Sequence, residues 1–240
     1  MKSGPSGRGQ RIWSELTKKN KYLRLNIDRI IDALLEVQEH FPEINRVLEL
    51  HREHITDEII QNMVAGYKFV DNLVASDIGL FSDLGLQYML ELNHIVLCGR
   101  DPKVRLEYTH HITETRRRFY EYIQPIKRWY KKHKDDSPIK VASEVYVGIL
   151  SRPQLYIEGN HRTGSLIATY LLLTRGCPPF VLNKDNAVAY FQPSSQIKFS
   201  DKTSFKGRLR LPKYEKAFKQ FLEENISEDF LLHPSSCRQE

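Results

Sequence analysis

One short segment carries the side chains whose types and spacing could do chemistry: Glu158-Gly159-Asn160-His161-Arg162-Thr163-Gly164. It stands directly before an apolar run of helical length, residues 166–173. Small residues in front of a helix allow consecutive main-chain N–H groups to converge on an anion, and the helix N-terminus adds its positive end. Glu158 can hold a divalent cation, and Arg162 can clamp a phosphate oxygen. The segment predicts a phosphate-binding turn with a metal ligand at its entrance.

The elements that must position this segment are predicted to be helices. Ser137-Pro138 is a helix-start signal, Pro153 stops that helix just before the segment, and Gly176 with Pro178 closes the next one. Apolar residues at helical spacing predict the other helices. The expected helices cover about 22–41, 44–50, 55–74, 84–99, 113–133, 137–152, 163–175 and 184–191, with a last one opened by Pro212.

Two stretches lack helical spacing. Val104, Leu106 and Tyr108 alternate with polar residues, which predicts a short strand or hairpin arm. Residues 192–210 are polar and rich in Ser and Lys, which predicts a loop.

Composition narrows the class of protein. The 240 residues include 40% hydrophobic residues and three scattered cysteines, so we expect a folded protein with reduced thiols and a cytoplasmic location. No apolar stretch suggests a membrane span, so we expect no membrane partner. A net charge of +6 favours anionic ligands such as nucleotides, but charge alone is weak evidence for nucleic acid, which we do not expect as a partner. The sequence leaves room for a homo-oligomer.

The motif and its flanks resemble the signature of the Fic family and its Doc relatives, which runs His-x-Phe-x-Asp/Glu-Gly-Asn-Gly-Arg-x-x-Arg between two helices. Positions matching the signature's phosphate- and metal-binding part are Glu158, Gly159, Asn160, Arg162 and the neighbouring Gly164. Gln154 falls on the histidine, Tyr156 on the Phe, His161 on the second Gly and Ser165 on the last Arg.

The resemblance implies an all-α, Fic-like helical domain with a short β-hairpin flap and an N-terminal helical extension. It covers about residues 84–225. We therefore expect a flexible tail at 1–12, the helical extension at 13–83, the Fic-like core at 84–225 and a C-terminal tail at 226–240. The flap, which in this family precedes the motif and binds the target by strand addition, would contain Val104, Leu106 and Tyr108.

The resemblance also implies a function. Glu158 would bind Mg²⁺, the phosphates of ATP or another nucleotide would contact Gly159, Asn160, His161, Arg162 and Gly164, and a nucleotide monophosphate or similar group would pass to a hydroxyl of an unidentified target protein. Gln154 departs from this pattern because an amide cannot accept a proton near pH 7. Ser165 removes the Arg that would hold the terminal phosphate.

These departures leave several hypotheses open. The first is an unusual transferase in which Gln154 positions the attacking group. The second is a catalytically inactive Fic domain that binds a nucleotide or a protein, and the third is a basic nucleic-acid-binding protein. His161 would either contact a phosphate, act as a displaced base, or point into solvent.

Overall fold

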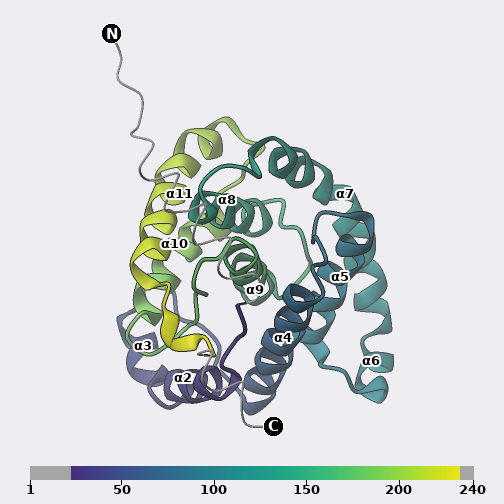
Figure 1. The fold of residues 1–240 in the computed structure, drawn as a ribbon. Helices are drawn as coiled ribbons and strands as arrows, with labels where there is room; N and C mark the ends of the chain where they lie inside the picture. The colour runs from purple at the N-terminus through teal and green to yellow at the C-terminus, as the bar shows by residue number, and fades with distance from the viewer. Residues whose placement is uncertain (1–22, 233–240) are drawn as a thin grey trace.

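The structure is a computed structural model that describes residues 23–232. Its central helix begins within the motif. Figure 1 shows this helix, α9 (Asn160–Leu173), in the middle of the molecule with the other helices around it. Every residue of α9 except His161 and Arg162 is buried. The apolar run that follows the motif forms a helix because neighbouring helices cover all its sides.

The surrounding helices are α2 (Ile27–Glu39), α3 (Phe41–Val47), α4 (Asp57–Ala75), α5 (Asp83–Cys98), α6 (Pro102–Glu107), α7 (Thr109–His133), α8 (Pro138–Leu150), α10 (Ala187–Phe199) and α11 (Phe205–Asn225), with a 3₁₀ turn at Glu228–Phe230. Within residues 23–232 there are no strands, only isolated bridges such as that between Leu25 and Leu231. The all-α prediction is confirmed. No helix in this part of the chain has the length and hydropathy of a membrane span.

Caps explain where the helices around the motif begin. The Ser137 hydroxyl accepts a hydrogen bond from the Lys140 N–H, and Pro138 occupies the first turn of α8, as the sequence predicts. The side chains of α8 and α9 interlock where Gly164 meets Tyr146. A Cβ at position 164 would stand 3.0 Å from the Tyr146 ring, so the close approach of the two helices depends on this glycine.

The predicted strand at Val104, Leu106 and Tyr108 is wrong, because residues 102–107 form helix α6. The Asp101 side chain caps this helix, accepting from the Lys103 N–H, and Pro102 occupies its first turn. The cap and the proline favour a helix more strongly than the alternation of three apolar residues with polar ones favours a strand.

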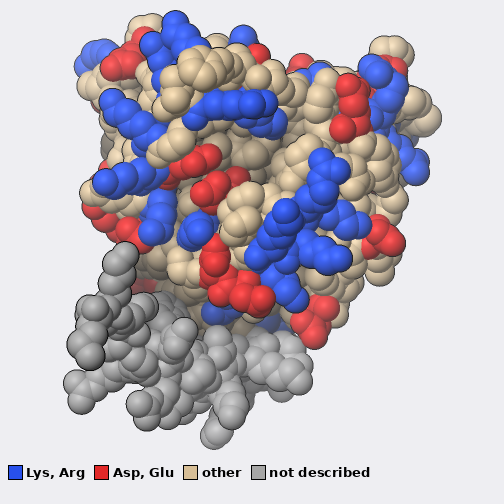
Figure 2. Space-filling model, turned by 90° about the horizontal axis from the view of Figure 1, so that it is seen from above, with Lys and Arg blue, Asp and Glu red and all other residues tan. Residues whose placement is uncertain are grey.

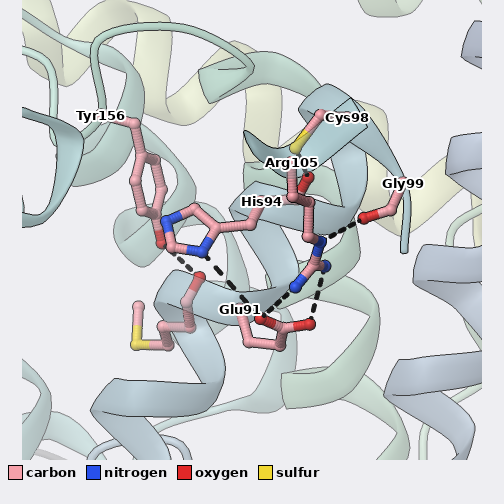
Figure 3. A network of polar contacts seen from close by, with 7 residues as sticks. Glu91, His94, Cys98, Gly99, Arg105 and Tyr156 are labelled. Carbon is pink, nitrogen blue, oxygen red and sulfur yellow. Dashed lines mark hydrogen bonds and ion pairs between the residues drawn. The ribbon is translucent and has the colours of Figure 1, made fainter. Parts of the chain in front are cut away.

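Figure 3 shows how α6 is attached to α5. Arg105 donates from Nε to the Gly99 carbonyl at 2.9 Å and from Nη2 to the Glu91 carboxylate at 2.8 Å. His94 lies beside the same carboxylate, at 3.9 Å.

The predicted loop at 192–210 is also wrong, because α10 continues to Phe199 and α11 begins at Phe205. Serines that suggested a loop are buried in α10, where the hydroxyls of Ser194 and Ser195 donate to the Phe191 carbonyl. The Ser204 side chain caps α11, so Pro212 lies inside that helix instead of opening it. The predicted tail at 1–12 lies outside the described residues.

Candidate functional site

The motif loop between α8 and α9 is held in place by side chains that are distant in the sequence, Arg118 on α7 and Lys202 between α10 and α11. Arg118 on α7 donates from Nε to the Gln154 carbonyl at 2.9 Å. Lys202 donates from Nζ to the carbonyl oxygens of Gly148 at 2.7 Å and Ser151 at 3.3 Å, which closes the C-terminal end of α8. Burial lowers the pKa of Lys202 to about 8. These three hydrogen bonds hold the entrance to the motif in place without a ligand.

Gly159 makes the sharp turn into α9. Its φ of 71° lies in the left-handed region, and a Cβ there would come within 3.1 Å of the Asn93 amide nitrogen. That nitrogen donates to the carbonyl oxygen of Glu158 at 3.0 Å and to the hydroxyl of Thr163 at 3.0 Å. Asn93 on α5 thereby fixes both sides of the turn.

The N-terminus of α9 is open for an anion. No side chain caps this helix, and the Thr163 N–H is the first that bonds within it, to the Gly159 carbonyl at 2.8 Å. The N–H groups of residues 160–162 belong to the first turn, whose donors have no partner inside a helix. They carry the positive end of a helix dipole and can bind a phosphate oxygen.

This helix end faces a cavity of about 610 Å³. Such a volume is typical of small-molecule sites. One wall is the motif, another is formed by α2, α4 and the segment between α3 and α4, and the third is α10. Its polar lining includes Arg52, Glu53, His54, Gln154, Glu158, Asn160, His161, Arg162, Ser165, Ser195 and Lys198, with a larger apolar area formed by residues such as Leu34, Val37, Ile60, Met63, Phe180 and Phe191.

Glu158 is exposed at the edge of this cavity. Glu53 lines the same cavity from the segment before α4. Within residues 23–232 there is no group of three or more His, Cys, Asp or Glu side chains that could hold a metal ion by itself. Mg²⁺ typically binds proteins through one or two carboxylates and completes its octahedron with water and substrate phosphates. Glu158 could supply one such carboxylate ligand.

Arg162 lies beside the helix end, where its Nη1 donates to the Val96 carbonyl at 3.0 Å. Burial lowers the pKa of this guanidinium, while Glu158 acts in the opposite direction. An arginine stays charged through such a shift. Arg162 thus supplies a fixed positive charge on the same turn as the Glu158 carboxylate.

His161 does not supply a second positive charge. Its imidazole is largely buried, and this burial, followed by the charges of Arg52, Lys198 and Arg162, lowers its pKa well below the usual value of 6.5. The imidazole is therefore neutral near pH 7. Only its main-chain N–H, in the first turn of α9, is placed to attract a phosphate.

Hydrogen bonds assign the tautomer of this imidazole. The Tyr146 hydroxyl donates to the Tyr190 hydroxyl at 3.0 Å, and Tyr190 donates to the His161 carbonyl at 3.3 Å. Tyr146 therefore accepts from Nδ1 of His161, 3.2 Å away, which leaves Nε2 with the lone pair. Nε2 is buried without a hydrogen-bond partner in the described residues. This lone pair is a weak base that is sealed from water.

Gln154 lies at the cavity wall but is already bound to the end of α8. Its side-chain nitrogen donates to the Leu150 carbonyl at 3.1 Å. The neutral amide can position a ligand group but cannot accept a proton. Ser165 also faces the cavity, and its hydroxyl donates back to the Arg162 carbonyl at 2.8 Å.

Two other predicted ligand residues have structural contacts instead. Both polar atoms of the Asn160 side chain bond to the main chain of Tyr156. Gly164 is buried against Tyr146. The expected flap residues Val104, Leu106 and Tyr108 are not among those that line the cavity.

Sequence reasoning missed the wall opposite the motif. Arg52, Glu53 and His54 come from the segment between α3 and α4, and Ser195 and Lys198 come from α10. No spacing in the sequence links these residues to the motif, because tertiary packing alone brings them to the cavity.

No protein-family model matches this chain, and a search of curated proteins finds no match.

Proposed function

We propose that the chain is a Fic-like transferase that binds a nucleotide through its phosphates and moves a phosphate-bearing group to a protein hydroxyl. The observation that carries this proposal is the uncapped N-terminus of α9, which faces a cavity of about 610 Å³ with Glu158 and Arg162 on the same turn. A helix, a phosphate-binding loop and a second helix in this order also support the resemblance to Fic proteins.

In this proposal the chain's own residues supply binding and charge. The N–H groups of residues 160–162 and the Arg162 guanidinium attract the phosphates, and Glu158 holds the Mg²⁺ that would neutralise charge on the phosphate oxygens. With ATP as donor, the hydroxyl oxygen of the target forms a bond to the α-phosphorus. The bond from that phosphorus to the bridging oxygen breaks, and pyrophosphate leaves with the electron pair. The hydroxyl proton passes to water.

The site places no general base to take up the proton of the target hydroxyl. Gln154 has no basic atom, and the Nε2 atom of His161 is buried and belongs to an imidazole whose pKa is lowered by burial. Lack of a placed general base costs on the order of 10²–10⁴ in rate. We therefore expect slow transfer, with binding and charge neutralisation as its main sources.

A second candidate function is a nucleotide-binding domain without transfer. The hydrogen bond from Gln154 to the Leu150 carbonyl favours it, because the side chain at the position of the family's histidine is used to close α8. Both functions require the same anion site, and they differ in whether a covalent product forms.

The nucleic-acid hypothesis gains no support from the surface in Figure 2. Lysine and arginine side chains on that face lie in several groups with acidic side chains between them. Because residues 102–107 are helical, strand addition at this place is not part of the proposal for target binding.

Mass spectrometry tests the transferase proposal. The full chain is incubated with Mg²⁺, cell extract and each nucleoside triphosphate in turn, beside a Glu158→Gln variant and the control Glu43→Gln, whose side chain is exposed outside the cavity. We expect a mass increase on a protein with the unchanged chain and with Glu43→Gln, and a loss of it with Glu158→Gln. Nucleotide binding without any mass increase would contradict transfer and support the second candidate.

A further inference from the structure

Arg52 is a half-buried cation on the cavity wall opposite the motif. Its Nη2 donates to the Ser195 hydroxyl at 2.7 Å, and its guanidinium carbon lies 4.4 Å from the centre of the Phe191 ring. Its Nε is buried without a hydrogen-bond partner in the described residues. The side chain is therefore held in a fixed position, but one of its N–H donors lacks a hydrogen-bond partner there.

The main chain at Arg52 is also fixed in advance. The Asn45 side chain accepts from the Arg52 N–H at 2.7 Å and donates to the Arg52 carbonyl at 3.1 Å. The segment between α3 and α4, which has no helical structure, is thereby held in place at Arg52. Such preorganisation removes part of the entropy cost of binding a ligand there.

Within residues 23–232, no carboxylate forms an ion pair with Arg52. Burial lowers its pKa, and the groups that act on it electrostatically are the neutral tyrosines Tyr190 and Tyr146. A buried positive charge without a counter-charge is destabilising unless something else compensates it. The protein keeps this charge on the wall of a cavity that can admit an anion.

Arg52 and the first residues of α9 line the same cavity. Arg52 is the largest charged contributor to the lowered pKa of His161, which is the second residue of that helix. The cavity also opens to solvent, because Leu50, Ile157 and Phe199 line it and are exposed by 40–53%. An anion can therefore enter and extend from the helix end to the guanidinium.

We propose that Arg52 is an anion-binding residue of this cavity, and that the ligand carries at least two phosphate groups, one at the N-terminus of α9 and one at Arg52. The identity of the ligand as a nucleotide rests on the proposed function, but the second anion site does not. The chemical class is a nucleoside di- or triphosphate rather than a monophosphate.

Calorimetry with two simple anions tests this assignment at constant ionic strength. Inorganic pyrophosphate and inorganic phosphate are titrated into the full chain, an Arg52→Gln variant and the control Arg46→Gln, whose side chain is exposed outside the cavity. A charge-assisted bond of this kind corresponds to roughly a 10- to 100-fold change in affinity. We expect Arg52→Gln to weaken pyrophosphate binding by this factor, to change phosphate binding less than about threefold, and Arg46→Gln to change neither.

An Arg52→Lys variant guards against a folding defect, since it keeps the positive charge and a long aliphatic stem. We expect it to retain more pyrophosphate affinity than Arg52→Gln, at the same thermal unfolding temperature. Equal pyrophosphate affinity in Arg52→Gln and the unchanged chain, or no binding by the unchanged chain, would overturn the assignment. An equal loss of phosphate and pyrophosphate would overturn the two-phosphate ligand. Because no nucleoside or metal is present, failure of group transfer leaves this test unaffected.

Discussion

Asn160 and Tyr156 form a closed pair at the tip of the motif loop. The Asn160 side-chain oxygen accepts from the Tyr156 N–H at 2.9 Å, and its amide nitrogen donates to the Tyr156 carbonyl at 2.9 Å. Both groups are buried. Asn160 therefore shapes the turn that presents the main-chain N–H groups, and one of its two amide N–H donors is used by the Tyr156 carbonyl.

Replacing Asn160 by Ala should lower the free energy of unfolding. The change leaves a buried N–H and a buried C=O without partners, at a cost of about 2–4 kcal/mol in total. Urea denaturation measures it. The exposed Asn72 on α4 gives the control, for which Asn72→Ala should change the value by less than about 0.5 kcal/mol. Similar values for the two variants would contradict the role of the Asn160–Tyr156 pair.

Gly159→Ala should also destabilise the turn. A residue with a Cβ in the left-handed region costs about 1–2 kcal/mol, and the new methyl group would press on the Asn93 amide. We expect the denaturation midpoint and the nucleotide affinity to fall together. Gly79→Ala is the matched control, since a Cβ at Gly79 meets nothing within 4 Å. If Gly159→Ala binds nucleotide as tightly as the unchanged chain, the turn is not the phosphate site.

Arg162→Ala should weaken nucleotide binding by roughly tenfold or more, because it removes a charge-assisted contact beside the helix end. Arg128→Ala is a suitable control because Arg128 is exposed on α7 and does not line the cavity. Arg118 would be a poor control, since it holds the Gln154 carbonyl. Calorimetric titration with ATP and Mg²⁺ compares the variants, and equal, negligible effects would remove Arg162 from the site.

Gln154→His should raise or create adenylyl transfer, because an imidazole at this position can accept the proton of a hydroxyl. Transfer of label from α-labelled ATP to protein measures the effect. The double change Gln154→His with Ser165→Arg adds a positive charge at a cavity residue and should orient a triphosphate better. If neither variant transfers label although both bind ATP, adenylyl transfer is not the chemistry of this cavity.

Glu215 on α11 should make stability depend on pH. Burial, and next the nearby Glu144 on α8, raise its pKa from the usual 4.5 to about 7. The folded state therefore binds the proton more tightly than the unfolded chain, and the free energy of unfolding falls as pH rises from about 4.5 to about 7. Glu215→Gln should flatten this slope, whereas the exposed Glu39→Gln should leave it unchanged. Denaturation at several pH values between 4 and 8 measures the slopes, and parallel curves would contradict the raised pKa.

Sequence reasoning found the turn because its information is local. The glycine at 159, the charges at Glu158 and Arg162, and the stop at Pro153 lie within a few residues of one another, and each has a direct structural meaning. Sequence could not assign the side-chain roles in the same way. The Asn160 side chain forms hydrogen bonds with the main chain of Tyr156, and these bonds exist only in the folded loop.

The two errors in secondary structure have one physical cause. At residues 102–107 and 192–210, short-range composition suggested a strand and a loop, but caps at Asp101 and Ser204 and burial of Ser194 favour helices. The cavity wall at Arg52 was out of reach for a different reason. It is brought to the motif by packing between segments far apart in the chain.

Helix α4 packs closely on α9, so the two helices belong to one folded unit. Gly66 lies so close to Leu166 that an added Cβ would stand 2.6 Å from its methyl carbon. A fragment that begins at residue 84 would lose this helix, uncover an apolar side of α9, and leave the cavity without the wall that carries Arg52. The smallest unit that retains both the hydrophobic core and the binding cavity must therefore include the helices that precede α5.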